Sequence, residues 1–137
     1  MESTTALGES SDEVIGLIRL GKFLTSCQET EAARKNILKA IQMARSLNIF
    51  HLTYWGLVIL ARIYLVEGQP EKALEIALIL RRYSIEAQIE RDDFDGLLMD
   101  LNANLPPEQI STMVNHTEGM MIEALLDQIL DGVEGRI

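Results

Sequence analysis

Cysteine, proline and aromatic side chains are scarce in this chain of 137 residues. The single cysteine, Cys27, cannot close an intrachain disulfide, which excludes a disulfide-stapled scaffold. Three prolines and nine glycines exclude collagen-like and mucin-like sequences. The longest apolar run, residues 56–66, contains Arg62 and is too short to span a bilayer, and the first eleven residues do not resemble a signal peptide. We therefore expect a cytoplasmic protein that does not enter a membrane.

Aliphatic side chains supply most of the apolar character. The chain is 47% hydrophobic and contains 20 Leu and 15 Ile against seven aromatic residues. Such Leu-rich, Pro-poor compositions are typical of helical proteins, and no segment alternates apolar and polar residues as a half-buried strand does. The sequence therefore predicts one all-α domain.

Charge is distributed unevenly along the chain. Residues 1–85 contain nine acidic and ten basic residues, a net charge of +1, whereas residues 86–137 contain twelve acidic and two basic, a net charge of −10. An acidic surface repels phosphate backbones, and the N-terminal part is not basic enough to compensate. We therefore expect no direct contact with nucleic acid.

A shift of forty residues superimposes one segment of the chain on another, which indicates an internal repeat. Gly21 and Ala61 are equivalent small residues that let a partner helix approach, and the larger Leu24 and Tyr64 fill the space between helices. The sequence therefore predicts two units, each a pair of antiparallel helices. The other equivalent pairs are Leu17 and Leu57, Leu20 and Leu60, Ala33 and Ala73, Ile37 and Ala77, Ala40 and Leu80, and Gln28 and Gly68.

Capping signals divide the chain into about seven helices. Residues 10–13 have the pattern of a capping box, Asn48 can end the second helix, and Gly68 followed by Pro70 predicts a left-handed stop and a new helix start. We expect the apolar fourth helix to be covered by the fifth. The predicted helices cover about 12–26, 29–47, 51–67 and 70–83, followed by a fifth that starts after Ser84, a sixth that starts at Pro106 and a seventh after a second capping box at 115–118.

The second unit resembles the tetratricopeptide repeat, a solenoid unit of two antiparallel helices, and residues 12–85 carry this resemblance. The first unit is a weaker copy, with Leu24 in place of an aromatic residue and Gln28 in place of Gly. The forty-residue period, longer than the usual ~34, is similar to the repeats that end large bacterial ATP-dependent regulators, including LuxR-type transcriptional activators. The segment that follows the repeats is similar to the tail of those proteins. The matching positions are Leu57, Leu60, Ala61, Tyr64, Gly68, Ala73, Ala77 and Leu80, and in the tail Leu98, Leu101, Leu105, Pro106, Pro107 and Glu108.

This resemblance implies a right-handed superhelical stack of helix pairs with a concave surface for a partner. The expected organisation is a flexible N-terminus (1–11), two helix pairs (12–85), C-terminal capping helices (86–131) and a tail (132–137). The chain has no phosphate-binding loop and no basic recognition helix, so the resemblance carries over neither ATPase activity nor DNA binding. We expect a non-catalytic scaffold for protein interactions, which serves as the sensing or docking module of a bacterial transcriptional or signalling regulator. A helical domain that senses a small molecule is the alternative.

Residues that carry catalytic or metal chemistry are sparse. His51 and His116 lie far apart and outside any cluster of potential ligands, and Cys27 has no catalytic signature around it. The closely spaced Asp92, Asp93 and Asp95 lack the remainder of a calcium loop, and are interpreted as a solvated acidic turn. We therefore predict no enzymatic activity, no metal and no cofactor.

Lys22 and Arg62 are the strongest candidates for binding. They are equivalent under the forty-residue shift, and in tetratricopeptide repeats this position faces the concave groove. Two cations along a groove can bind carboxylates of a partner protein or peptide, although ordinary surface residues that form local ion pairs are the simpler interpretation. The uncovered ends of a short stack also predict a homodimer through the N-terminal pair. The remaining groove candidates are Ile18, Val58, Thr25, Leu65 and Trp55.

Overall fold

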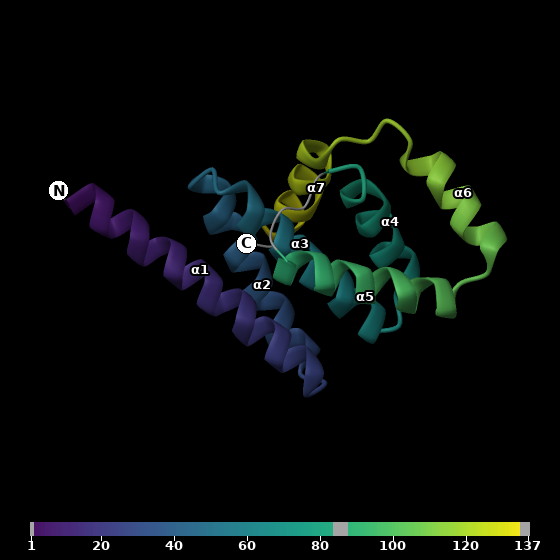
Figure 1. The fold of residues 1–137 in the computed structure, drawn as a ribbon, viewed down its shortest axis with the longest axis horizontal. Helices are drawn as coiled ribbons and strands as arrows, with labels where there is room; N and C mark the ends of the chain where they lie inside the picture. Colours follow the sequence, from purple (N-terminus) through teal and green to yellow (C-terminus); the bar gives the residue numbers. More distant parts are fainter. Residues whose placement is uncertain (1, 84–87, 135–137) are drawn as a thin grey trace.

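The computed structural model describes residues 2–83 and 88–134, and within these ranges the chain forms seven helices and no strand. The all-α prediction is confirmed. None of the described helices is long and apolar enough to cross a membrane. In Figure 1, α1 lies along one edge of the molecule and α6 along the opposite edge. The helices are α1 (Glu2–Ser26), α2 (Thr30–Ser46), α3 (Phe50–Val66), α4 (Pro70–Leu80), α5 (Gln88–Asn104), α6 (Pro107–Thr117) and α7 (Ile122–Glu134).

Three identical turns connect the first four helices. Gln28, Asn48 and Gly68 all adopt the left-handed conformation, with φ of 66°, 58° and 81°. In each turn the residue that follows the left-handed one donates a hydrogen bond from its backbone amide to the carbonyl of the residue five positions before the donor, at 2.8 to 2.9 Å. This is the geometry of a Schellman motif, which satisfies carbonyls at the end of a helix. The predicted stops at Asn48 and Gly68 are confirmed, and Gln28 adopts the conformation of its repeat partner despite its side chain.

Helix α2 packs tightly between α1 and α3, and two glycines make this possible. A Cβ atom on Gly21 of α1 would lie 2.5 Å from Cδ1 of Ile37, and a Cβ atom on Gly56 of α3 would lie 2.7 Å from Cγ1 of Ile41. Both distances are far below van der Waals contact, so α2 can approach its two neighbours only where they lack a side chain. The predicted role of Gly21 is confirmed.

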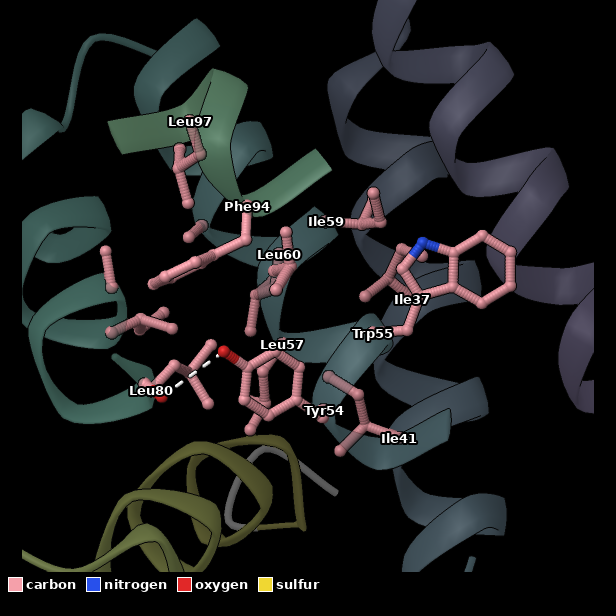
Figure 2. Packing of buried hydrophobic residues seen from close by; sticks show 14 of the residues in the cluster. Ile37, Ile41, Tyr54, Trp55, Leu57, Ile59, Leu60, Leu80, Phe94 and Leu97 are labelled. Atoms are coloured by element: carbon pink, nitrogen blue, oxygen red, sulfur yellow. Dashed lines mark hydrogen bonds between the residues drawn. The ribbon is translucent and has the colours of Figure 1, made fainter. Parts of the chain in front are cut away.

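Helix α4 is buried almost all round, as its apolar sequence predicts. It contacts α3, α5, α6 and α7, so the predicted cover by the fifth helix is confirmed and two further helices contribute. The hydroxyl of Tyr54 on α3 donates to the carbonyl of Leu80 at 3.2 Å, and its ring packs edge-on against Phe94 of α5. Figure 2 shows Tyr54 reaching from α3 toward the end of α4 among these side chains.

Polar contacts attach the two C-terminal helices to the helix pairs. The backbone amide of Ile122 at the start of α7 donates to the Tyr83 hydroxyl at 3.0 Å. Further along α7, Asp127 forms an ion pair with Arg45 of α2 at 2.6 Å. On α6, Gln109 donates to the Glu71 carboxylate of α4 at 2.9 Å. Helices α6 and α7 therefore cover α4 rather than forming a third pair with α5.

Two predicted helix starts are wrong. Helix α1 begins at Glu2 instead of after the box at 10–13, and no proline interrupts the Ser- and Thr-rich segment between them. Residues 115–118 end α6 rather than open α7, since Gly119 takes a left-handed φ of 85° and α7 begins at Ile122. The predicted cap at Ser84 and the tail residues 135–137 lie outside the described residues.

Candidate functional site

A partly buried carboxylate joins α1, α3 and α5 on one side of the molecule. Asp93 of α5 accepts a hydrogen bond from Nζ of Lys22 at 2.8 Å through one oxygen, and from Nε1 of Trp55 at 2.9 Å through the other. The Asp93 side chain is only 16% exposed, and Trp55 is buried at 6%. An aspartate is therefore held by one ammonium group and one indole donor, an arrangement that combines charge with direction.

Arg62, the second predicted cation, is also paired with a carboxylate of α5. Arg62 of α3 forms an ion pair with Asp100, seven residues along α5 from Asp93. The spacing of two helical turns places both carboxylates on the same side of α5, opposite the cations of α1 and α3. Lys22 and Arg62 thus bind carboxylates of their own chain, across sequence separations of 71 and 38 residues.

An open hollow of about 380 Å³ adjoins this carboxylate site. Helix α1 contributes lining residues spaced three and four apart, and Trp55 of α3 completes the lining. Phe23 is 62% exposed beside it. The lining residues are Arg19, Lys22, Phe23, Ser26 and Trp55.

Arg19 is the free cation of this hollow. Its side chain is exposed, and it has no ion pair with any residue whose side chain the structure describes, namely 11–83 and 91–130. Ser26 is not free in the same way, because its hydroxyl donates to the carbonyl of Phe23 at 2.6 Å. The hollow therefore offers an unengaged guanidinium next to two aromatic surfaces.

Most of the apolar groove candidates lie in the core instead. Ile18, Thr25 and Val58 are buried, so a partner does not reach them in this structure, and the Thr25 hydroxyl donates to the carbonyl of Gly21 at 2.7 Å. The prediction relied on their spacing of three or four residues from Lys22 and Arg62. A step of four residues rotates a side chain by about 40° around the helix, which here turns it toward the neighbouring helix. Leu65 is half-buried and packs against the core.

Sequence reasoning missed Arg19 and Phe23 of the hollow and Asp100 of α5. The interpretation of Asp93 as part of a solvated acidic turn is wrong, because Asp93 lies within helix α5 and is only 16% exposed. Arg19 lies three residues before Lys22, so the helical spacing that selected Lys22 also contained a signal for Arg19. Phe23 follows Lys22 directly, and its exposure depends on what covers α1 rather than on its type. No local pattern links Lys22 to Asp93, because their contact depends on how α5 returns across the helix pairs.

Side chains that could bind a metal ion do not form a cluster in the described part of the chain. No group of three or more His, Cys, Asp and Glu side chains lies close enough there to hold a metal ion. Cys27 is exposed at the end of α1, and His51 is exposed in the first turn of α3. The arrangement at α1, α3 and α5 can bind a carboxylate and shelter an apolar group beside it.

We compared the chain with known proteins and found no relative. No family model, curated protein or solved structure matches the chain. The class of protein therefore rests on the helix arrangement and the site themselves.

Proposed function

We propose that this protein is a non-catalytic interaction module that docks an acidic segment of a partner protein at the hollow on α1. The observation that carries the proposal is Asp93, whose carboxylate is held jointly by Lys22 and Trp55 at the edge of the hollow. This internal contact supports the proposal, because it places a carboxylate between a cation and an indole donor beside the hollow. A partner carboxylate would bind the neighbouring Arg19, and an apolar side chain of the partner would pack on Phe23.

The open form of the hollow favours a peptide over a small metabolite. Small-molecule sites bury most of the ligand surface within concave walls. Here Phe23 and Arg19 are both exposed, and the cations Lys22 and Arg62 are already paired with Asp93 and Asp100. A peptide that lies along α1 needs only the rim, where an aromatic ring and a cation remain available.

The proposal includes the finer arrangement of the stack. In it, α1 with α2 and α3 with α4 form a short right-handed solenoid of the tetratricopeptide type, with α1, α3 and α5 on its concave side. The forty-residue repeat and the three identical Schellman turns support this arrangement. As a docking or sensing module, such a stack would work within bacterial transcriptional or signalling regulation in the cytoplasm, as the sequence resemblance implies.

The test is a titration with a fluorescent acidic peptide that contains several aspartates and one leucine. We expect saturable binding that weakens with salt, because exposed charges are screened. Reversal of the rim charge in Arg19→Glu should weaken binding about tenfold at low salt, whereas Lys35→Glu, at an exposed position of α2, serves as the matched control. The same titration with a Lys22→Ala/Arg62→Ala variant measures how much the two paired cations contribute to peptide affinity.

Two results would overturn the proposal. One is the absence of binding by the unmodified chain at millimolar peptide; the other is equal affinity of the Arg19→Glu variant and the unmodified protein. A melting temperature raised by nucleotides or common metabolites but not by the peptide would favour the small-molecule sensor instead.

A further inference from the structure

The outward side of α1 exposes an apolar strip that no other described helix covers. Leu20 is 45% exposed and Phe23 is 62% exposed, one turn apart on the same side of the helix. Gly16 lies one turn before Leu20, and a Cβ atom there would meet no atom within 4 Å. We call these three residues the α1 strip. The opposite side of α1 carries Val14, Ile18, Gly21 and Thr25, which are buried against α2 and α3.

The forty-residue shift identifies what the α1 strip is shaped to receive. Gly16, Leu20 and Phe23 are equivalent to Gly56, Leu60 and Ile63 of α3. There, Leu60 and Ile63 are fully buried, and the side chain of Ile41 from the antiparallel helix α2 lies over Gly56. The strip is therefore the counterpart of a surface that, one repeat later, packs against an antiparallel helix with a large apolar side chain above the glycine.

We propose that the α1 strip pairs with the α1 strip of a second copy of this chain. In an antiparallel pair centred near Leu20, Phe23 of each copy lies over Gly16 of the other, because Gly16 and Phe23 are two turns apart on one side of the helix. Each strip thus supplies both the small residue and the large side chain that the α2–α3 packing uses. Such a two-fold interface is self-complementary and closed, so assembly stops at the dimer.

The composition of the exposed surface favours a second copy as the occupant. Among the described residues, the large apolar side chains that are exposed are Leu20, Phe23, Phe50, Met99 and Met121. Only the first two lie next to each other on one helix face with a glycine. The strip itself contains no charged residue, and the exposed Arg19 lies at its edge beside Leu20.

Gly16→Glu is the variant that tests this proposal without harming the fold. The space around Gly16 is open, and replacement of a helical glycine raises helix propensity, so the single chain should remain folded with an unchanged or higher melting temperature. In the dimer the new side chain would occupy the place of Phe23 of the second copy. Gln42→Glu adds the same charge at an exposed position of α2 and is the matched control.

Sedimentation equilibrium measures the mass directly. We expect the unmodified chain and Gln42→Glu to approach twice the 15.4 kDa chain mass with increasing concentration, and Gly16→Glu to remain at the single mass. A single mass for the unmodified chain up to about 1 mM, where only negligible affinity would escape detection, overturns the proposal. A dimer that persists in Gly16→Glu overturns it equally, because the interface then lies elsewhere.

The lone, exposed Cys27 reports the orientation of the two helices. A spin label there lies about 7 residues from the two-fold axis, so helical rise and interhelical spacing predict a separation of about 25 Å between the two backbones in the antiparallel pair. A separation of about 10 Å, expected for parallel helices in register, contradicts the proposed pairing. Phe23 belongs to both the hollow and the α1 strip, so the acidic peptide and a second copy compete for it. Gly16 does not line the hollow, so the monomeric Gly16→Glu variant should still bind the acidic peptide, which separates failure of the dimer from failure of the docking function.

Discussion

The two helix pairs share a sequence pattern but not an environment. Leu20 and Leu60 are equivalent leucines, yet the first is 45% exposed and the second is completely buried. Helix α3 packs against α1, α2, α4 and α5, whereas α1 packs mainly against α2 and α3. Burial in this fold is therefore set by a helix's place in the order of packing, and the repeat pattern alone does not determine it.

The largest difference between the pairs should appear when the equivalent leucines are truncated. Leu60→Ala should lower the free energy of unfolding by about 3 kcal/mol, because it opens a cavity in the core. Leu20→Ala should cost less than about 1 kcal/mol in the single chain, because its side chain is already half in solvent. Urea unfolding at low protein concentration measures both values. Equal losses would show that the two environments are alike.

The glycines of α1 should respond in opposite directions to the same substitution. Gly21→Ala should lower the free energy of unfolding by about 1–3 kcal/mol, because the added carbon overlaps the Ile37 side chain. At low protein concentration, where the chain is single, Gly16→Ala should raise it by about 0.5–1 kcal/mol, because the methyl group then meets only solvent and the helix propensity improves. Thermal unfolding of both variants gives the comparison, and a stabilising Gly21→Ala would contradict the close approach of α2.

Two of the carboxylates of α5, Asp93 and Asp100, allow a comparison between a sheltered and an exposed ion pair. Asp93→Ala leaves the indole N–H of buried Trp55 without its acceptor, and should cost about 1–2 kcal/mol. Asp100 is 53% exposed, so Asp100→Ala should cost about 0.5 kcal/mol. Chemical denaturation followed by tryptophan fluorescence suits this test, since the single Trp reports on the first site directly. A larger loss for Asp100→Ala would refute the assignment.

The smallest effect is expected at the turns. Gln28 and Gly68 are repeat partners with the same left-handed backbone, which a glycine adopts at little cost. Gln28→Gly should therefore raise the free energy of unfolding by about 0.5 kcal/mol, and Gly68→Gln should lower it by about 1 kcal/mol. Paired melting curves at the same concentration resolve the difference. Changes of the same sign at both positions would contradict the shared turn geometry.

Sequence reasoning succeeded where the responsible interactions are local. Helical periodicity, the stop at Gly68 and the small residue at Gly21 depend on neighbours within a few turns, and the structure agrees with each. The box at residues 115–118 failed because the same residue types serve the end of one helix as well as the start of the next. A capping pattern therefore gives a boundary only together with the apolar pattern that follows it.

The candidate site was only partly accessible to sequence reasoning for a different reason. Lys22 was found from its repeat position, but its partner Asp93 comes from a helix outside the repeat, 71 residues away. The exposure of Phe23 likewise depends on which neighbour α1 lacks. These contacts and this exposure depend on how α5 packs across α1 and α3, and the spacing of residues within α1 does not determine that packing.

The three identical turns divide the first part of the chain into units of equal length. They lie at Gln28, Asn48 and Gly68, so one helix with its turn occupies twenty residues, and two such lengths restore the original direction of the chain. A duplication of residues 29–68 would thus lengthen the stack by one helix pair without a change of direction, whereas an insertion of twenty residues would reverse everything that follows. The same turns that end the helices also fix the size of the unit by which this molecule can grow.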